Sequence, residues 1–239
     1  LSDAERQDVE AYLSQKWLDE PYYRNCQELY NSGQTTDGDY TIDIDGYNGP
    51  RPPMTATCDF ITSGNGQGGW TLIMNYVRDG SSSTDAISAV NDRLPLMVSN
   101  TLGDDEVSHA TAWGHTAPSL LSNINFTEIR VNCQDDSHSR VVDFSTTSST
   151  LISLLKTGAG QVTAFEDFTE LANDSANMGS SSVSGYNTTT ATDQVYGYWM
   201  QGGGGNEFTP GGFAGGTTWE CDNNTNTHTN STIHRFWVK

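Results

Sequence analysis

Four cysteines constrain the fold of this chain more than any other feature. Cys26, Cys58, Cys133 and Cys221 contain no Cys-x-x-Cys spacing, which argues against a zinc knuckle or a thioredoxin-type redox pair. Two disulfides are the simpler interpretation. Of the three pairings, we favour Cys26 with Cys58 and Cys133 with Cys221, because it needs no crossing between the two halves of the chain. Disulfides predict an extracellular or cell-surface location.

Net charge limits the partners of the chain. Among its 239 residues 30 are acidic and 11 are basic, which gives a formal charge of −19 at pH 7. Phosphate backbones would be repelled, so nucleic acid is excluded as an expected partner. The acidity fits a cation-rich external medium or a merely soluble acidic surface.

No apolar run of eighteen residues occurs, so no membrane insertion is expected. Without a signal peptide, the sequence reads as a mature or excised piece around one main core.

Local patterns predict one leading helix and then mostly strands. A capping box from Ser2 to Glu5 begins the helix, and Pro21 ends it. Further helices are predicted at 84–90 and at 148–157, where Gly158 closes the second. Short alternating runs predict strands at 39–44, 55–60, 70–77, 128–133, 140–144 and 233–238. Aromatic residues within the Ser-, Thr-, Asn- and Gly-rich stretch between 175 and 232 indicate long ordered loops, which usually carry function.

The segment from Asn25 to Ile73 carries a family resemblance. In order it contains Asn-Cys-Gln-Glu-Leu-Tyr-Asn-Ser-Gly (25–33), Gly-Asp-Tyr-Thr-Ile-Asp-Ile-Asp-Gly (38–46), prolines between 50 and 53, Cys-Asp-Phe (58–60) and Gly-Gly-Trp-Thr-Leu-Ile (68–73). This order resembles the start of fibrinogen C-terminal-like domains, above all bacterial modules with a Tyr-Cys-Asp and Gly-Gly-Gly-Trp signature. Thr57 and Gln67 depart from that signature.

The resemblance implies an α+β fold with a small N-terminal subdomain, a central mixed sheet and long loops. In that family the first cysteine bonds to the one of the Cys-Asp element, which here implies a bond from Cys26 to Cys58. Such a bond contributes about 2 to 4 kcal/mol to a subdomain too small to bury enough surface. Gly68 and Gly69 are expected to allow a tight turn that places Trp70 in the core.

The two ends of the chain resemble other families. Gly-Tyr-Trp-Met-Gln-Gly-Gly-Gly-Gly-Asn-Glu-Phe-Thr-Pro (197–210), Thr-His (227–228) and Ile-His-Arg-Phe-Trp-Val-Lys (233–239) are similar in order to the glycan-binding end of intelectins. Residues 1–24 resemble the last helix of a laminin-G or concanavalin-like module, with an ordinary capping helix as the alternative. The expected domains are a leading helix at 1–24 and a fibrinogen-like domain at 25–239, divided into 25–78 and 79–239.

A calcium site is predicted near the C-terminus. Calcium takes six to eight oxygen ligands, held on loops. The row 222–228 follows Cys221 directly and is rich in oxygen-bearing side chains. The candidate ligands are Asp222, Asn223, Asn224 and Asn226, with Glu207 and Glu220 flanking them. The ligand set of intelectins is not transferable, because Tyr198 and Trp199 stand where those proteins carry a histidine and an asparagine.

Sugar recognition needs an aromatic wall and polar groups that orient hydroxyls. The candidate ligand-binding residues are Trp219, Tyr198, Trp199, Phe208, Phe213 and His228. For any single aromatic residue, core packing is the alternative. Asp43 and Asp45 share a face of a predicted strand, where a surface role is commoner than metal binding.

Catalytic signatures are weak in this sequence. His109 and His115 do not fit a zinc pair, and no Gly-x-Ser-x-Gly elbow occurs.

Together, these features predict that the chain is a lectin-like, calcium-assisted binding module of an adhesin or secreted multidomain protein, and not an enzyme. Its expected partners are extracellular glycans, with oligomerisation left open. The alternatives are a structural or peptide-recognition module without a glycan site and, third, a polysaccharide hydrolase that uses paired carboxylates.

Overall fold

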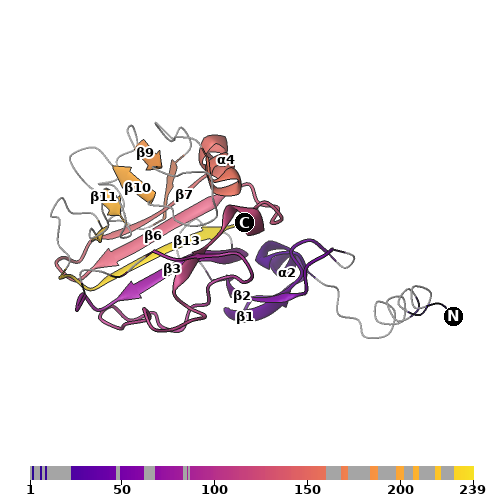
Figure 1. Ribbon diagram of the computed structural model, residues 1–239. Coiled ribbons are helices and arrows are strands. Elements are labelled where there is room, and N and C mark those ends of the chain that lie inside the picture. Colours follow the sequence, from indigo (N-terminus) through magenta and orange to yellow (C-terminus); the bar gives the residue numbers. More distant parts are fainter. Residues whose placement is uncertain are drawn as a thin grey trace.

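The described residues cover most of the first two thirds of the chain and parts of the rest. This computed structural model describes residues 2, 6, 9, 23–46, 49–61, 68–82, 85, 87–159, 168–171, 184–187, 198–201, 207–209, 219–221 and 229–239 (Figure 1). Of the leading helix only Ser2, Arg6 and Val9 are included, and the Arg6 amide donates to the Ser2 carbonyl at 3.0 Å. The rest of that predicted helix and its boundary at residue 24 lie outside the described residues.

Helices are short in the described part of the chain, where they comprise α2 (Cys26–Asn31), α3 (Pro118–Leu121) and α4 (Ser149–Thr157). None of them is long and apolar enough to cross a membrane. The helix predicted at 148–157 is confirmed: Ser148 caps α4 through its side chain, and Gly158 ends it with a φ of 66°. Helix α2 was not predicted, although Asn25 caps it by accepting from the Glu28 amide.

A large mixed sheet dominates the molecule. Its described strands are β1 (Gly38–Ile42), β2 (Met54–Asp59), β3 (Trp70–Arg78), β4 (Ala89–Val90), β5 (Gly114–Thr116), β6 (Ile129–Asp135), β7 (Val141–Thr146), β8 (Phe168–Glu170) and β13 (Thr232–Val238). The main order is β1-β2-β3-β13-β6-β7-β8, all antiparallel, while β4 and β5 pair in parallel. The six strands predicted from alternation are confirmed, with ends displaced by one or two residues.

A smaller antiparallel sheet contains the last part of the chain before β13. Its strands are β9 (Ser184–Asn187), β10 (Tyr198–Gln201), β11 (Glu207–Thr209) and β12 (Glu220–Cys221), in the order β12-β11-β10-β9. The fold is therefore α+β, as the sequence predicts, with a central mixed sheet.

The prediction of a helix at 84–90 is wrong. None of the described residues in this range is helical, and Ala89 and Val90 form β4 against β5. The Ala117 amide donates to the Val90 carbonyl at 2.7 Å. A short apolar run without a strong cap has little helical preference of its own, so pairing with a neighbouring strand decides its conformation.

The N-terminal subdomain is pinned by the predicted disulfide. Cys26 of α2 is bonded to Cys58 of β2, with their Cα atoms 5.5 Å apart, and both are buried. In Figure 1, α2, β1 and β2 gather at one end of the main sheet. Strand β2 pairs with β3, so the main sheet continues from the N-terminal subdomain into the rest of the fold.

Gly68 and Gly69 are structural, as predicted. A Cβ atom on Gly68 would lie 2.2 Å from the carbonyl oxygen of Phe60. Gly69 has a φ of +99°, and a Cβ atom there would lie 3.0 Å from the Cα of Gln27 in α2. The turn therefore lets α2 approach closely while Trp70 enters the interior, where it is fully buried.

We expect Gly69→Ala to lower the free energy of unfolding by about 1 to 3 kcal/mol, through its unfavourable φ and its contact with Gln27. Urea denaturation of the oxidised protein measures this loss. Gly33→Ala is the matched control, because Gly33 has a φ of +103° but a Cβ atom added there would meet nothing within 4 Å. Equal losses in the two variants would show that crowding at Gln27 contributes nothing.

The main sheet separates an apolar core from a polar outer face. Val131, Phe144 and Phe236 lie on the core side, together with Leu151 and Leu154 of α4. On β13, Arg235 and Trp237 alternate with these core positions. Trp237 packs with Trp70 and Leu72 in a second, small cluster. The outer face thus combines a few aromatic groups with charged and amide side chains.

Candidate functional site

The predicted C-terminal site lies mostly outside the described residues. These undescribed positions are Asp222, Asn223, Asn224, Asn226, His228 and Phe213. For Tyr198, Trp199 and Glu207 only the backbone, in β10 and β11, is described. Where the chain enters this region, the second predicted disulfide is present: Cys221 of β12 is bonded to Cys133 of β6, with Cα atoms 5.8 Å apart.

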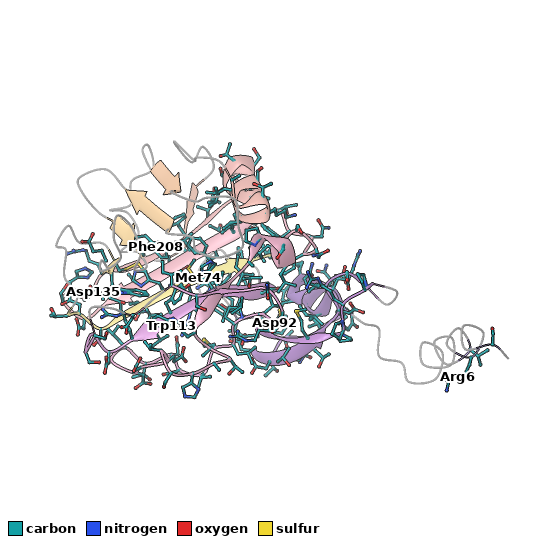
Figure 2. The ribbon with its side chains drawn as sticks, in the orientation of Figure 1. Arg6, Met74, Asp92, Trp113, Asp135 and Phe208 are labelled. Carbon is teal, nitrogen blue, oxygen red and sulfur yellow. A yellow bond between two sulfur atoms is a disulfide. The ribbon has the colours of Figure 1, made fainter. Side chains whose placement is uncertain are left out.

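Two predicted ligand-binding aromatics lie in the core instead. Trp219 and Phe208 are both 0 % exposed. The Trp219 ring lies 5.6 Å from Tyr76 and 5.5 Å from Trp113, and Phe208 stacks on Phe236 at 5.3 Å. Phe208 and Trp113 both lie within the body of the fold (Figure 2). Neither Trp219 nor Phe208 offers a ring face to solvent, so core packing, the alternative left open by the sequence, describes both.

The described histidines of the core are neutral structural groups. Burial lowers the pKa of His115 to about 3 and that of His234 to about 4. Nδ1 of His115 lies 2.5 Å from the Tyr76 hydroxyl, and Nε2 of His234 lies 2.8 Å from the carbonyl oxygen of Glu220. Glu220, a predicted calcium ligand, is 1 % exposed. Within the described ranges, no three His, Cys, Asp or Glu side chains gather to hold a metal ion.

A cleft on the outer face of the main sheet is the strongest candidate site in the described part of the chain. Its volume is about 380 Å³. Strands β13, β6 and β7 form the floor, and the walls come from the N-terminal subdomain and from residues 97–100. The lining residues are Asp37, Cys58, Asp59, Met97, Asn100, Arg130, Asn132, Gln134, Val141, Asp143, Arg235 and Trp237. We call this the outer-face cleft.

Strand register brings the polar groups of the floor together. Arg235 of β13 stands opposite Asn132 of β6, and Asn132 stands opposite Asp143 of β7. Gln134 lies two residues along β6 from Asn132, and therefore on the same face of the sheet. One row of side chains across three strands thus combines a guanidinium, an amide and a carboxylate.

Arg130 is held in place by two carboxylates of the cleft. Its Nε and Nη2 atoms donate to the two oxygens of Asp143, each at 2.7 Å, and its Nη1 donates to Asp59 at 2.7 Å. Burial lowers the pKa of the guanidinium, but the hydrogen bonds and charges of Asp143 and Asp59 outweigh it and raise the pKa above its ordinary value. Because both carboxylates are bound to a permanent cation, this arrangement suits binding better than proton transfer.

Arg235 is held by neutral groups. Nε donates to Oδ1 of Asn75 at 2.8 Å, Nη1 to Oδ1 of Asn100 at 2.6 Å, and Nη2 to the Ser99 carbonyl at 2.5 Å. Burial lowers the pKa of this guanidinium to about 10, which still leaves it charged at neutral pH. Asn100 is thereby oriented with its amide nitrogen free of other hydrogen bonds among the described residues.

Other groups of the outer-face cleft keep hydrogen-bonding capacity for a ligand. Within the described part of the chain, the Gln134 side chain makes no hydrogen bond, and Asn132 makes a single long one, at 3.4 Å to the Val142 carbonyl. Trp237, Met97 and Val141 add apolar surface beside them. Sequence reasoning missed this site. Its only signal is that polar residues alternate with buried ones on β6, which is also the pattern of an ordinary solvated face.

Solved structures that are similar to this chain include two fibrinogen-like domains. No family model matches the chain, and no curated protein matches it. Among solved structures, the chain is similar to the fibrinogen-like globe domain of human ANGPTL6, with a TM-score of 0.42 and 13 % identity over 91 % of this chain and 95 % of that chain. It is also similar to the fibrinogen-like globe domain of human ANGPTL2, with a TM-score of 0.41 and 16 % identity over 91 % of this chain and 98 % of that chain.

Proposed function

We propose that the chain is an extracellular recognition module that binds carbohydrate in the outer-face cleft. The observation that carries this proposal is the set of amide, guanidinium and carboxylate groups that line this cleft together with Trp237. Sugar hydroxyls both donate and accept hydrogen bonds, so they match such a mixed lining. The sugar ring also has an apolar face, which packs against an aromatic side chain. A volume of about 380 Å³ accommodates one or two sugar units.

Charge in the outer-face cleft favours a neutral ligand. Two guanidiniums, of Arg130 and Arg235, face three carboxylates, of Asp37, Asp59 and Asp143. The lining is therefore not positive overall, and it offers no attraction to phosphate or to polyanions. The hydrogen bonds that hold both arginines also keep the cleft in one arrangement before a ligand arrives, which lowers the cost of binding. A neutral saccharide is the ligand class that fits this lining.

Two disulfides support an extracellular location. We include in the proposal that the module belongs to a fibrinogen-like adhesin or secreted multidomain protein, and that calcium assists its binding through the row 222–228. The support for calcium is the oxygen-rich sequence of that row and its attachment to β6 through Cys221.

Protein or peptide recognition is the second candidate. Ile61 is 67 % exposed and Val98 is 55 % exposed. The Ile61 amide donates to Asp37 of the outer-face cleft, and Val98 follows Met97 in the chain. Large apolar side chains beside a cleft suit a peptide with apolar anchors.

A glycan array on the oxidised protein, run in millimolar calcium and again in a chelator, tests the first proposal. We expect hits whose affinity falls about tenfold in Asn132→Ala and in Gln134→Ala, because each variant removes a hydrogen-bonding amide from the floor. Asn91→Ala is the matched control, since Asn91 is an exposed amide away from the cleft whose side chain makes no hydrogen bond within the described ranges. Arrays without hits in both buffers, from a folded sample, would favour peptide recognition instead.

A further inference from the structure

Two aspartates that follow β1 direct buried oxygens at each other without a counter-charge. Asp43 is 3 % exposed, and Asp45 is partly buried. Asp45 accepts from the Arg51 amide through Oδ2 at 3.1 Å, while the Gly46 amide donates to the backbone carbonyl of Asp43 at 3.1 Å. The Oδ1 atoms of Asp43 and Asp45 are both buried, and neither accepts a hydrogen bond from a donor group of the described residues.

These two carboxylates lie close enough to interact directly. Burial raises the pKa of Asp43, and the neighbouring Asp45 carboxylate raises it further. The nearest arginines along the chain are used elsewhere: Arg24 forms an ion pair with Glu28 at 2.7 Å, and the Arg51 guanidinium donates to the Asn91 carbonyl at 3.2 Å. In the described part of the chain, therefore, no side-chain cation forms an ion pair with either aspartate. Two neighbouring carboxylates, one buried and one partly buried, need a positive charge or a shared proton between them.

We propose that Asp43 and Asp45 bind a hard divalent cation, with Ca²⁺ as the expected ion, through their Oδ1 atoms. An all-oxygen donor set selects a hard ion over zinc or copper. Two carboxylates supply part of the shell, and backbone carbonyls and water supply the rest, as is common for calcium. This site is separate from the row 222–228 and does not depend on the proposed function.

Position in the fold indicates what the ion would do. The Asp43 amide donates to the Tyr23 carbonyl at 2.8 Å, so the turn after β1 is joined to the segment that leads into α2. Arg51, whose amide contacts Asp45, reaches residue 91 of the main domain. An ion bound by the two aspartates would therefore hold the turn that connects the N-terminal subdomain to its surroundings.

Calorimetry on the intact, oxidised chain tests the site with Ca²⁺ alone. We expect calcium at a hundredfold excess over its Kd to raise the Tm by about 5 to 10 °C relative to a chelator. Titration calorimetry should give one more bound calcium per chain in the wild type than in Asp43→Asn. Asp92→Asn is the matched control, because Asp92 is exposed and its side chain makes no hydrogen bond or ion pair within the described ranges. It should keep both the Tm shift and the stoichiometry.

A proton shared by Asp43 and Asp45 is the chemical alternative to a bound cation. The variant Asp43→Asn distinguishes between these two explanations. The amide of asparagine can donate to Asp45 as a protonated acid would. If a cation occupies the pair, Asp43→Asn binds one calcium fewer per chain and loses the part of the calcium-dependent Tm shift that this site contributes. A variant as stable as the wild type with an unchanged calcium response would overturn the proposal. A wild-type Tm that calcium leaves unchanged, but that rises as the pH is lowered, would also overturn it in favour of the proton.

Discussion

Replacing both Cys133 and Cys221 with alanine is expected to lower the free energy of unfolding by about 4 to 5 kcal/mol. The bond joins β6 to β12 across a sequence separation of 88 residues, so its removal frees a long loop in the unfolded chain. Both sulfurs are buried, and the variant also loses their packing. Urea denaturation under non-reducing conditions measures the loss.

The matched control removes the other bond. Cys26 and Cys58 are separated by 32 residues, so the loop term predicts a smaller loss, of about 3 to 4 kcal/mol, for their double alanine variant. If the short loop proved the costlier one to open, native packing around Cys26 would outweigh the entropy of the unfolded chain.

Trp219→Ala is expected to lower the free energy of unfolding by about 3 to 5 kcal/mol. The ring is completely buried between Tyr76 and Trp113, and the Arg78 guanidinium lies 5.2 Å from its centre. Removing it opens a cavity in the core and leaves a buried cation without its aromatic neighbour. Thermal unfolding followed by near-ultraviolet circular dichroism measures the effect.

Trp219→Phe tests the reason for that loss. Phenylalanine keeps an aromatic ring at the same site, so we expect it to recover more than half of the stability lost in Trp219→Ala. Glycan binding measured on the folded fraction provides the second reading. An alanine variant with wild-type stability and no glycan binding would contradict core packing and would return Trp219 to the ligand site.

Local patterns were sufficient for much of the fold. Alternation located the six predicted strands, and the Ser148 and Gly158 caps located α4, because these signals depend on neighbours in sequence. The pairing of the four cysteines was also predicted, since the most local pairing of four is the simplest to form. The predicted helix at 84–90 failed because pairing between β4 and β5 outweighed a weak local preference.

The candidate sites were less predictable than the fold. The sequence indicated a site at 222–228, but that row lies outside the described residues and its calcium ligands stay a prediction. The outer-face cleft was missed because its groups come from separate strands. Arg130 and Asp143 are thirteen residues apart and Arg235 lies near the C-terminus, so only the register of β13, β6 and β7 brings them together.

By itself, the sequence determined six of the strands, helix α4 and the acidic character of this protein, because each depends on neighbouring residues or on composition. It also favoured the disulfide pairing that the structure shows. Only the tertiary structure decided which side chains are buried: it placed Trp219 and Phe208 in the core and left Asn132 and Gln134 in the outer-face cleft. The physical reason is that successive side chains of a strand point to opposite faces of the sheet. Whether a face is buried in the core or remains open to a ligand depends on which other elements pack against it.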